Sequence, residues 1–167
     1  MAFTVEDGTG TDPLANAYIS VAEMQAYFAD RSPLDPGVLS SDLELAIVRA
    51  TDYIELEYGN QFLGDLLVTD QALCWPRTYD LDNPMPAALK NATSEFANSS
   101  LTSDLFFVPT YDASGKTVKR QFDKVGPIET ETEWSDGGST DFTRKRYPIA
   151  ERWMKIITFG GSGGVVR

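Results

Sequence analysis

The segment from residue 71 to residue 96 constrains the fold more than any other part of the sequence. It opens with a short apolar run that ends in Trp75-Pro76-Arg77, continues through an acidic loop and enters an alanine-rich segment behind two prolines. A residue before proline avoids the helical region, so we expect Trp75 to be extended, with its indole in the core and its N–H bonded. Because proline is tolerated in the first turn of a helix, the sequence predicts a structural corner at Trp75, Pro76 and Arg77, then a helix over residues 86–100.

Arg77 is the one cation between Arg49 and Lys90, and several aspartates surround it in the sequence. One interpretation is a structural ion pair that holds the tryptophan corner closed. The other is a contact with a neighbouring subunit, for which the planar guanidinium is well suited.

Two capping boxes predict helices in the first third of the chain. Ser20 with Glu23 and Ser41 with Glu44 both have the Ser-x-x-Glu spacing in which each side chain caps a backbone N–H. They predict helices over residues 20–30 and 41–58, and Gly59 is typical of the end of the second helix.

The second of these helices has one apolar and one acidic face. Leu43, Ile47, Ala50 and Ile54 recur at helical spacing and predict its core face. The opposite face carries Asp52, Glu55 and Glu57. It is either a solvated face or a wall that faces DNA without holding it.

The last third of the chain predicts strands and one more helix. Residues 118–125 and 128–134 alternate with a period of two, which favours two antiparallel strands with a carboxylate face opposite lysine and arginine. Pro148 then opens a helix within residues 147–159. We expect four residues to form its apolar face: Ile149, Trp153, Ile156 and Ile157.

The termini differ in composition from the rest of the chain. Residues 1–17 are rich in glycine, threonine and aspartate, and predict either a frayed terminus or an arm that orders against a neighbouring subunit. The N-terminus lacks the basic and apolar regions of a signal peptide. Residues 160–167 form a flexible glycine-rich tail with an apolar tip.

Composition excludes several kinds of chemistry. The 167 residues contain no histidine, which removes Ser–His and Cys–His catalysis and the commonest metal ligand. The single cysteine, Cys74, lies in an apolar run and is more typical of a buried thiol than of a nucleophile. Asp80-Leu81-Asp82-Asn83 lacks the glycine and distal glutamate of a calcium loop. We therefore expect no enzymatic activity, no metal and no cofactor. No apolar run approaches the ~20 residues of a membrane span.

The charge is unevenly distributed. Residues 1–83 hold 15 acidic and 3 basic residues, a net charge of −12, and residues 84–167 hold 10 acidic and 11 basic residues, a net charge of +1. A protein that grips phosphates is expected to carry a basic face, so this balance argues against nucleic-acid binding. The one candidate for DNA binding is the basic cluster Arg144–Arg146 with the aromatic residues Tyr147 and Trp153.

Five short motifs occur in an order that resembles a known family. They are Val5–Gly8 with Ala17–Glu23, then Arg49–Tyr53, then Gln71–Leu73 before Trp75–Arg77, then Pro86–Ala92, and finally Lys124–Glu129. Over roughly Val5 to Glu129 the chain resembles the phage head–tail connector (adaptor or head-completion) family, often labelled a DnaT-like single-stranded-DNA-binding domain.

The resemblance implies a mainly α fold, a helical bundle with a projecting antiparallel β-hairpin and flexible termini (α+β), in a single connector domain. The expected parts are an N-terminal arm over 1–17, a helical core over 18–108, the hairpin over 116–134, the C-terminal helix over 147–159 and the tail over 160–167.

The resemblance also implies a function and its partners. Copies would form a homo-oligomeric ring of about twelve in the virion neck, after assembly in the host cytoplasm. This ring would join the portal protein to a tail-terminator or stopper protein, and DNA would pass through an acidic lumen without specific binding. The alternative is a single-stranded-DNA-binding replication accessory protein.

Interface residues follow from the same resemblance, segment by segment. The candidates for the portal interface are Tyr147, Trp153, Ile156, Phe159, Val165, Val166 and Arg167. The candidates for the ring or tail interface are Ile128, Glu129, Glu131 and Trp134.

Overall fold

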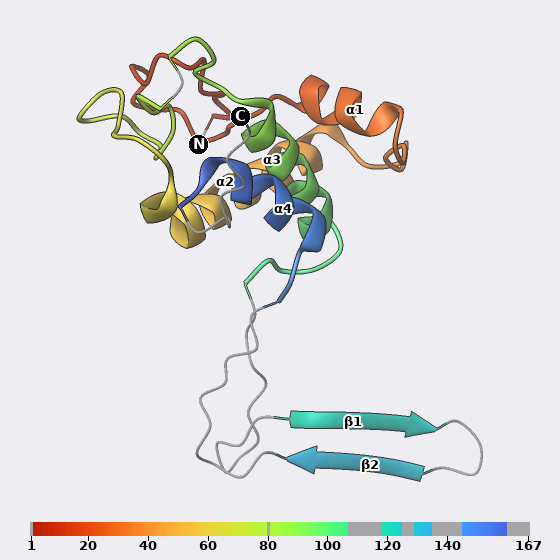
Figure 1. The fold of residues 1–167 in the computed structure, drawn as a ribbon. Coiled ribbons are helices and arrows are strands. Elements are labelled where there is room, and N and C mark those ends of the chain that lie inside the picture. Colours follow the sequence, from red (N-terminus) through yellow and green to blue (C-terminus); the bar gives the residue numbers. More distant parts are fainter. Residues whose placement is uncertain (1, 80, 107–117, 125–128, 135–144, 160–167) are drawn as a thin grey trace. The chain divides into compact units, whose positions relative to one another are not determined.

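The computed structural model describes residues 2–79, 81–106, 118–124, 129–134 and 145–159. The chain forms two compact units, one of residues 1–105 with 146–167 and one of residues 106–145. The first unit contains the helices α1 (Val21–Ala29), α2 (Ser40–Tyr58), α3 (Ala87–Ser100) and α4 (Pro148–Ile157), and the short 3-10 helix η1 (Gly59–Gln61) (Figure 1). The chain is therefore mainly helical, as predicted.

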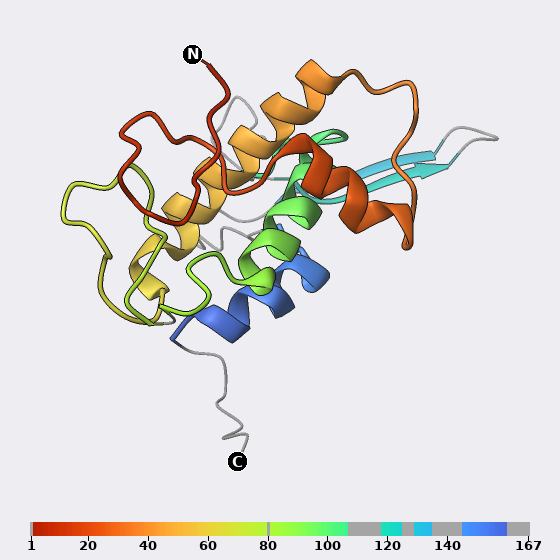
Figure 2. The ribbon, with the colours of Figure 1, turned by 90° about the horizontal axis from the view of Figure 1, so that it is seen from above.

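Helix α3 forms the centre of the helical unit. It packs against α2 on one side and against α4 on the other, so the three helices make one layer with α3 in the middle (Figure 2). Its sequence allows this because small buried residues, Ala88, Ala92 and Ala97, let neighbouring helices approach closely. The outer sides of α2 and α4 are thereby left at the two edges of the layer.

The first predicted capping box is confirmed and the second is wrong. Ser20 caps α1, where its side chain accepts from the Glu23 N–H and the Glu23 carboxylate accepts from the Ser20 N–H. Helix α2 begins one residue earlier than predicted, with Leu39 as its N-cap and no side-chain cap. Ser41 consequently lies inside the first turn, where its hydroxyl is not at the capping position.

Gly59 follows α2 for a different reason from the one predicted. Its φ of −50° is right-handed, so it does not form the left-handed helix end that favours glycine, and the chain continues into η1. A Cβ at this position would lie 2.8 Å from the Cys74 sulfur. Glycine is needed here because the corner segment passes so close to the end of α2.

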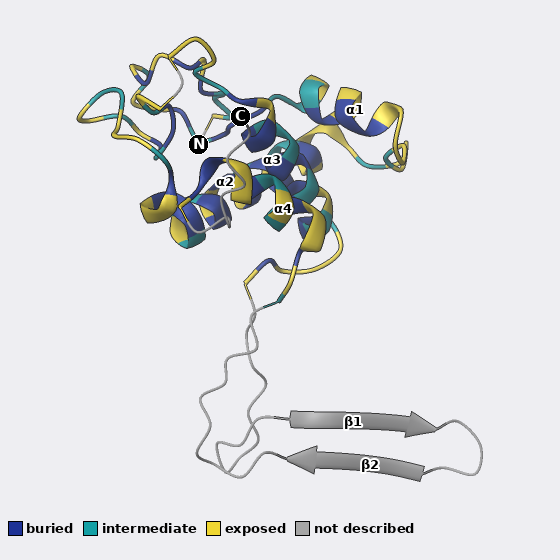
Figure 3. Ribbon diagram, viewed as in Figure 1, coloured by how far each residue is buried: buried dark blue, intermediate teal, exposed yellow. Residues whose placement is uncertain are grey.

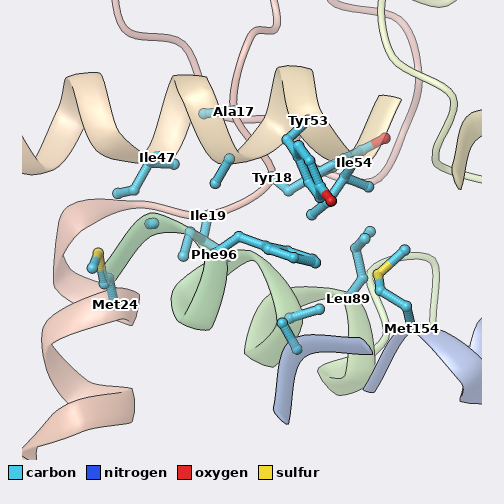
Figure 4. Close-up of a cluster of buried hydrophobic side chains, with 14 of the residues drawn as sticks. Ala17, Tyr18, Ile19, Met24, Ile47, Tyr53, Ile54, Leu89, Phe96 and Met154 are labelled. Atoms are coloured by element: carbon cyan, nitrogen blue, oxygen red, sulfur yellow. The ribbon is translucent and has the colours of Figure 1, made fainter. Parts of the chain in front are cut away.

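The core lies between α2, α3 and α4 and extends to the segment before α1 (Figure 4). Tyr53, Phe96 and Tyr147 form its aromatic centre, with ring centroids 4.9 Å apart for Tyr53–Phe96 and 5.3 Å apart for Phe96–Tyr147. The first contact is tilted and the second is edge-on, and such aromatic contacts add stability beyond the area that they bury. The fully enclosed side chains include Tyr18, Ile19, Met24, Ile47, Ile54, Leu89 and Met154.

The N-terminal segment packs on its own chain, so the prediction of a frayed terminus is wrong, and a contact of this arm with a neighbouring subunit stays a prediction. Val5 forms a parallel bridge with Ala17, and the Glu6 N–H donates to the Ala17 carbonyl at 2.9 Å. Glu6 is only 3% exposed, and its Oε1 accepts from the Gly8 and Gly10 N–H groups. Both glycines have positive φ, which lets the loop close around this carboxylate.

The second unit contains two antiparallel strands, β1 (Val118–Lys124) and β2 (Glu129–Trp134). Arg120 lies opposite Glu133, and Lys124 lies opposite Glu129, so the predicted pairing of cationic and acidic positions is confirmed at the level of register. An irregularity in the pairing falls between Val118 and Arg120. That this hairpin projects from the helices stays a prediction, and the tail over 160–167 lies outside the described residues.

Candidate functional site

The outward surface of α4 is the most distinctive surface of the helical unit. The side chains of α4 fall on three sides of the helix. Residues seven apart lie on the same side, because seven residues make almost two full turns. Ala150, Met154 and Ile157 are buried. Ile149 and Ile156 are 58% and 56% exposed, and Phe159 just beyond the helix is 63% exposed. Figure 3 shows the alternation of buried and exposed segments along this helix.

The third side of α4 is cationic. Arg152 and Lys155 are three residues apart, so their side chains leave the helix in similar directions, and both are exposed. Arg146, just before the helix, is exposed as well. We define the apolar face of α4 as Ile149, Trp153 and Ile156 with Phe159, and the cationic face as Arg152 and Lys155.

The structure divides the four residues that were predicted to form the apolar face of α4. Ile157 is buried and Trp153 is half-buried against the core, whereas Ile149 and Ile156 are exposed. The smallest residue of the helix, Ala150, is buried, and α4 packs against α3. Four large apolar residues around one short helix could not reveal from spacing alone which of them would be covered.

The structure separates the predicted portal residues into three groups. Tyr147 lies in the core, 7% exposed, and its hydroxyl donates to the Leu105 carbonyl at 2.9 Å, so its side chain is not available to a partner. Trp153, Ile156 and Phe159 belong to the apolar face of α4. Residues 165–167 lie outside the described residues.

The predicted ring or tail residues belong to the second unit. Glu129, Glu131 and Trp134 occupy β2, opposite Lys124, Phe122 and Val118 respectively. Ile128 lies outside the described residues. The register puts two of the three glutamates of β2 opposite cationic positions of β1.

The predicted DNA-binding cluster does not assemble around Tyr147, because that ring is buried in the core. Another cation–aromatic pair, which the sequence reasoning missed, lies at the end of α1. The Arg31 guanidinium stacks over the Tyr27 ring, 4.0 Å from its centroid, and the Tyr27 hydroxyl donates to Glu95 at 2.8 Å. Burial and the neighbouring Glu95 raise the pKa of Tyr27. Arg31 lies just beyond the end of α1, and its spacing of four residues from Tyr27 was the signal that could have revealed this pair.

The tryptophan corner is a rigid part of the fold. Trp75 is fully buried, its indole N–H donates to the Pro84 carbonyl, and the Trp75–Pro76 peptide bond is cis. Its ring packs edge-on against Phe62, with centroids 5.3 Å apart.

Arg77 holds this corner through backbone carbonyl groups, and neither an ion pair nor a subunit contact is needed to explain it. Its guanidinium donates to three carbonyl oxygens, at 2.5 Å for Cys74, 2.9 Å for Gly64 and 2.8 Å for Gly59. These three carbonyls come from separate turns of the chain, so Arg77 ties the end of α2 to the corner. The guanidinium also lies 5.6 Å from the centroid of the Phe62 ring.

Glu55 is not part of a solvated acidic face, contrary to one reading of the sequence. Its carboxylate accepts from the Tyr18 hydroxyl and, at 2.8 Å, from the Cys74 N–H, so it joins α2 to the N-terminal segment and to the corner. Burial and the nearby Glu55 raise the pKa of the Cys74 thiol to about 11. Cys74 is therefore a neutral, unreactive thiol at physiological pH.

The described part of the helical unit also has one pocket of about 280 Å³ where α1, the following loop and α2 meet. Its lining is mostly apolar: Gln25, Ala29, Pro33, Leu34, Asp35, Pro36, Val38 and Leu43. Among the described residues, no group of three or more cysteine, aspartate or glutamate side chains could hold a metal ion. No described helix is long and apolar enough to cross a membrane.

Comparison with known proteins identifies the family but gives no individual relative. Neither the curated proteins nor the solved structures contained a match to the chain. A family model described as "Putative DnaT-like ssDNA binding protein" matches residues 1–167, the whole chain, so the protein belongs to this DnaT-like family.

Proposed function

We propose that the protein is a structural component of a phage virion, which forms a ring between the portal and the tail. The observation that carries this proposal is the apolar face of α4. Large apolar side chains exposed together, beside cationic residues, are typical of a surface that binds another protein.

The apolar face of α4 and the C-terminal residues together suit the role of portal contact. Ile156 and Phe159 are each more than half exposed, and the chain continues from them into a tail that ends in Val165-Val166-Arg167. In this proposal the hairpin of β1 and β2 projects from the helices and contacts neighbouring copies or the next tail ring.

The net charge of −11 fits a passage for DNA better than a DNA-binding groove. A ring of many copies multiplies this charge, and an acidic lumen repels phosphates, so that DNA slides without adhering. The proposal therefore includes a lumen lined by carboxylates from the acidic N-terminal half of the chain.

The second candidate function is single-stranded DNA binding, which the description of the family names. The exposed guanidinium of Arg31 supports this candidate as a cation for phosphates, but the Tyr27 ring beneath it is only 9% exposed and offers no stacking surface for a base. Glu95 lies beside this pair, however, and contributes a negative charge where phosphates would need cations.

Two binding assays separate the candidates. The purified chain is tested against assembled portal protein by biolayer interferometry, and against a labelled oligothymidylate by mobility shift at low and physiological salt. We expect portal binding that Ile156→Asp weakens at least about tenfold, a change of ~1.4 kcal/mol. Leu81→Asp, at a position 66% exposed in a loop, is the matched control and should bind like the wild type. Tight oligothymidylate binding at physiological salt, without portal binding, would overturn the proposal.

Removal of residues 160–167 tests the contribution of the tail. We expect the truncated chain to keep the melting temperature of the wild type, because the described core ends before these residues. Its affinity for the portal should fall. Unchanged portal affinity would exclude the tail from the contact and leave the apolar face of α4 as the candidate.

A further inference from the structure

The outward side of α2 carries an acidic and apolar stripe that nothing in its own helical unit covers. Leu45, Asp52 and Leu56 recur at helical spacing on the side opposite the buried residues of α2, and the two leucines are 49% and 74% exposed. Asp42 and Arg49 are exposed on the same side. We define the acidic stripe as Leu45, Asp52 and Leu56.

Asp52 makes no ion pair with another described residue, although Arg49 lies three residues before it on the same side of α2. Among the residues that the structure describes, the one ion pair joins Lys90 and Glu23, on other helices. Partial burial raises the pKa of Asp52. A partner that placed a further cation beside the carboxylate would favour its charged form.

The opposite edge of the layer has the complementary charge. Residues 40–58 contain five acidic residues and one basic residue, of which Asp42, Asp52 and Arg49 are exposed on the outward side, while Glu55 is bonded within the helical unit. Residues 145–157 contain one acidic residue and four basic residues. The acidic stripe lies on α2 and the cationic face lies on α4, and α3 separates the two helices (Figure 2). One molecule therefore presents an acidic edge and a basic edge on opposite sides of the same layer.

We infer that the acidic stripe of α2 is the docking site for the cationic face of α4 from a second copy of this chain. The inference deepens the proposed function and rests on it, because it names the two surfaces through which ring neighbours would meet. Two different surfaces make a heterologous contact, and repetition of such a contact closes into a ring when the rotation between neighbours permits. Because each copy has an acidic edge and a basic edge, all copies in the ring would also point in the same direction.

The side chains on the two surfaces suit this contact. Leu45 and Leu56 can cover the aliphatic stems of Arg152 and Lys155, while the charged ends reach Asp52 and the flanking carboxylates. Arg152 lies between Ile149 and Ile156 on the helix surface, at three and four residues' spacing, so the cationic face adjoins the apolar face that is proposed for the portal.

Two single variants and their mixture test the inference. Asp52→Lys should disable the acidic stripe and leave the cationic face intact, and Arg152→Glu should do the reverse. We expect each variant to self-associate at least about tenfold more weakly than the wild type, as measured by native mass spectrometry and sedimentation, because like charges would face each other. Asp70→Lys, an exposed loop position with the same change of charge, is the control and should associate like the wild type.

The mixture gives the result that is specific to a heterologous contact. In a mixture of the two single variants, the cationic face of the Asp52→Lys chain meets the acidic stripe of the Arg152→Glu chain, and the other two surfaces carry exchanged charges that are again opposite. We expect the mixture to recover oligomers in which the two variants alternate, larger than those that either variant forms alone. The double variant Asp52→Lys/Arg152→Glu should recover larger oligomers, because its charges are exchanged. Circular dichroism checks that every variant is folded.

Three outcomes of the self-association measurements would overturn the inference. They are wild-type oligomers that both single variants form equally well, a double variant that remains as weak as the single ones, and a wild-type chain that stays monomeric up to its solubility limit. Each of these outcomes leaves the portal-binding assay to decide the proposed function separately. Loss of portal binding in Asp52→Lys with normal self-association would assign the acidic stripe to the portal instead and would also overturn the inference.

Discussion

At the scale of single residues, the fold depends on two side chains of the corner, Trp75 and Arg77. The sequence indicated that Trp75 is buried, because a large aromatic side chain in an apolar run would expose much apolar surface to water if it stayed outside the core. The sequence could not indicate the partners of Arg77, because the carbonyl groups of Gly59 and Gly64 lie near the guanidinium only in the folded chain. Nearby aspartates in the sequence suggested an ion pair, yet carbonyl oxygens are the acceptors.

Substitution of Trp75 by alanine should destabilise the protein strongly. Trp75→Ala removes a fully buried side chain and its bond to the Pro84 carbonyl, so we expect the free energy of unfolding to fall by about 3–5 kcal/mol through cavity formation. Denaturant unfolding measures this loss. Tyr79→Ala, at a loop position 54% exposed, serves as the control and should change little. A wild-type melting temperature for Trp75→Ala would contradict a core role for the indole.

Arg77→Lys tests whether geometry or charge matters at the corner. Lysine keeps the positive charge but cannot donate to three separate carbonyl groups from one planar fork. We expect a loss of about 1.5–3 kcal/mol in unfolding free energy, the range for hydrogen bonds to charged groups. Arg49→Lys, on the exposed side of α2, should be close to neutral. Equal stability of the two variants would show that the three carbonyl contacts add nothing.

At the scale of elements, the sequence indicated the helices well and their faces less well. Helices α1 and α3 agree with their predicted ranges because capping and proline signals are local. The orientation of α4 could not be read from its sequence, because apolar residues occur on more than one side of it. The outcome was decided by contacts with distant parts of the chain, above all Tyr147 with Phe96 and the packing of α4 against α3.

Ser20 and Ser41 were both predicted to cap a helix, and their alanine variants form a matched pair for stability measurements. Ser20→Ala should cost about 1 kcal/mol of unfolding free energy, because it removes the acceptor for the Glu23 N–H. Ser41→Ala should be nearly neutral or slightly stabilising, because Ser41 lies inside the first turn of α2, where alanine is the better helix former. Thermal unfolding of both variants checks the contrast. The reverse order of the two effects would contradict the observed starts of these helices.

At the scale of the whole molecule, α1 is joined to α3 by the ion pair of Glu23 with Lys90, whose charged atoms are 2.7 Å apart. Burial alone would raise the pKa of Glu23, but hydrogen bonds from Lys90 and Ser20 outweigh that effect and lower it below its ordinary value of 4.5. A carboxyl group with a lowered pKa in the folded state stabilises the fold above its unfolded pKa.

The sign of this effect gives a test with pH. The contribution of Glu23 should be complete above about pH 4.5 and should disappear as the pH falls through the lower pKa of the folded state. Glu23→Gln should therefore be less stable than the wild type at pH 7, and the difference should shrink toward pH 3. Chemical denaturation at several pH values measures it. A difference that does not depend on pH would show that the glutamate acts through its shape and not through its charge.

The enclosed position of α3 has a consequence for any assembly built from the two edges of its layer. Because Ala92 and the other small residues of α3 set how far α2 stands from α4, the tilt between the edges depends on core volume. In the ring proposed above, each contact between neighbours would repeat that tilt. The curvature of the ring would therefore depend on buried methyl groups that contact no partner. The number of copies that completes the circle would then be a property of the interior, and enlarging one alanine would change it without touching any contact residue.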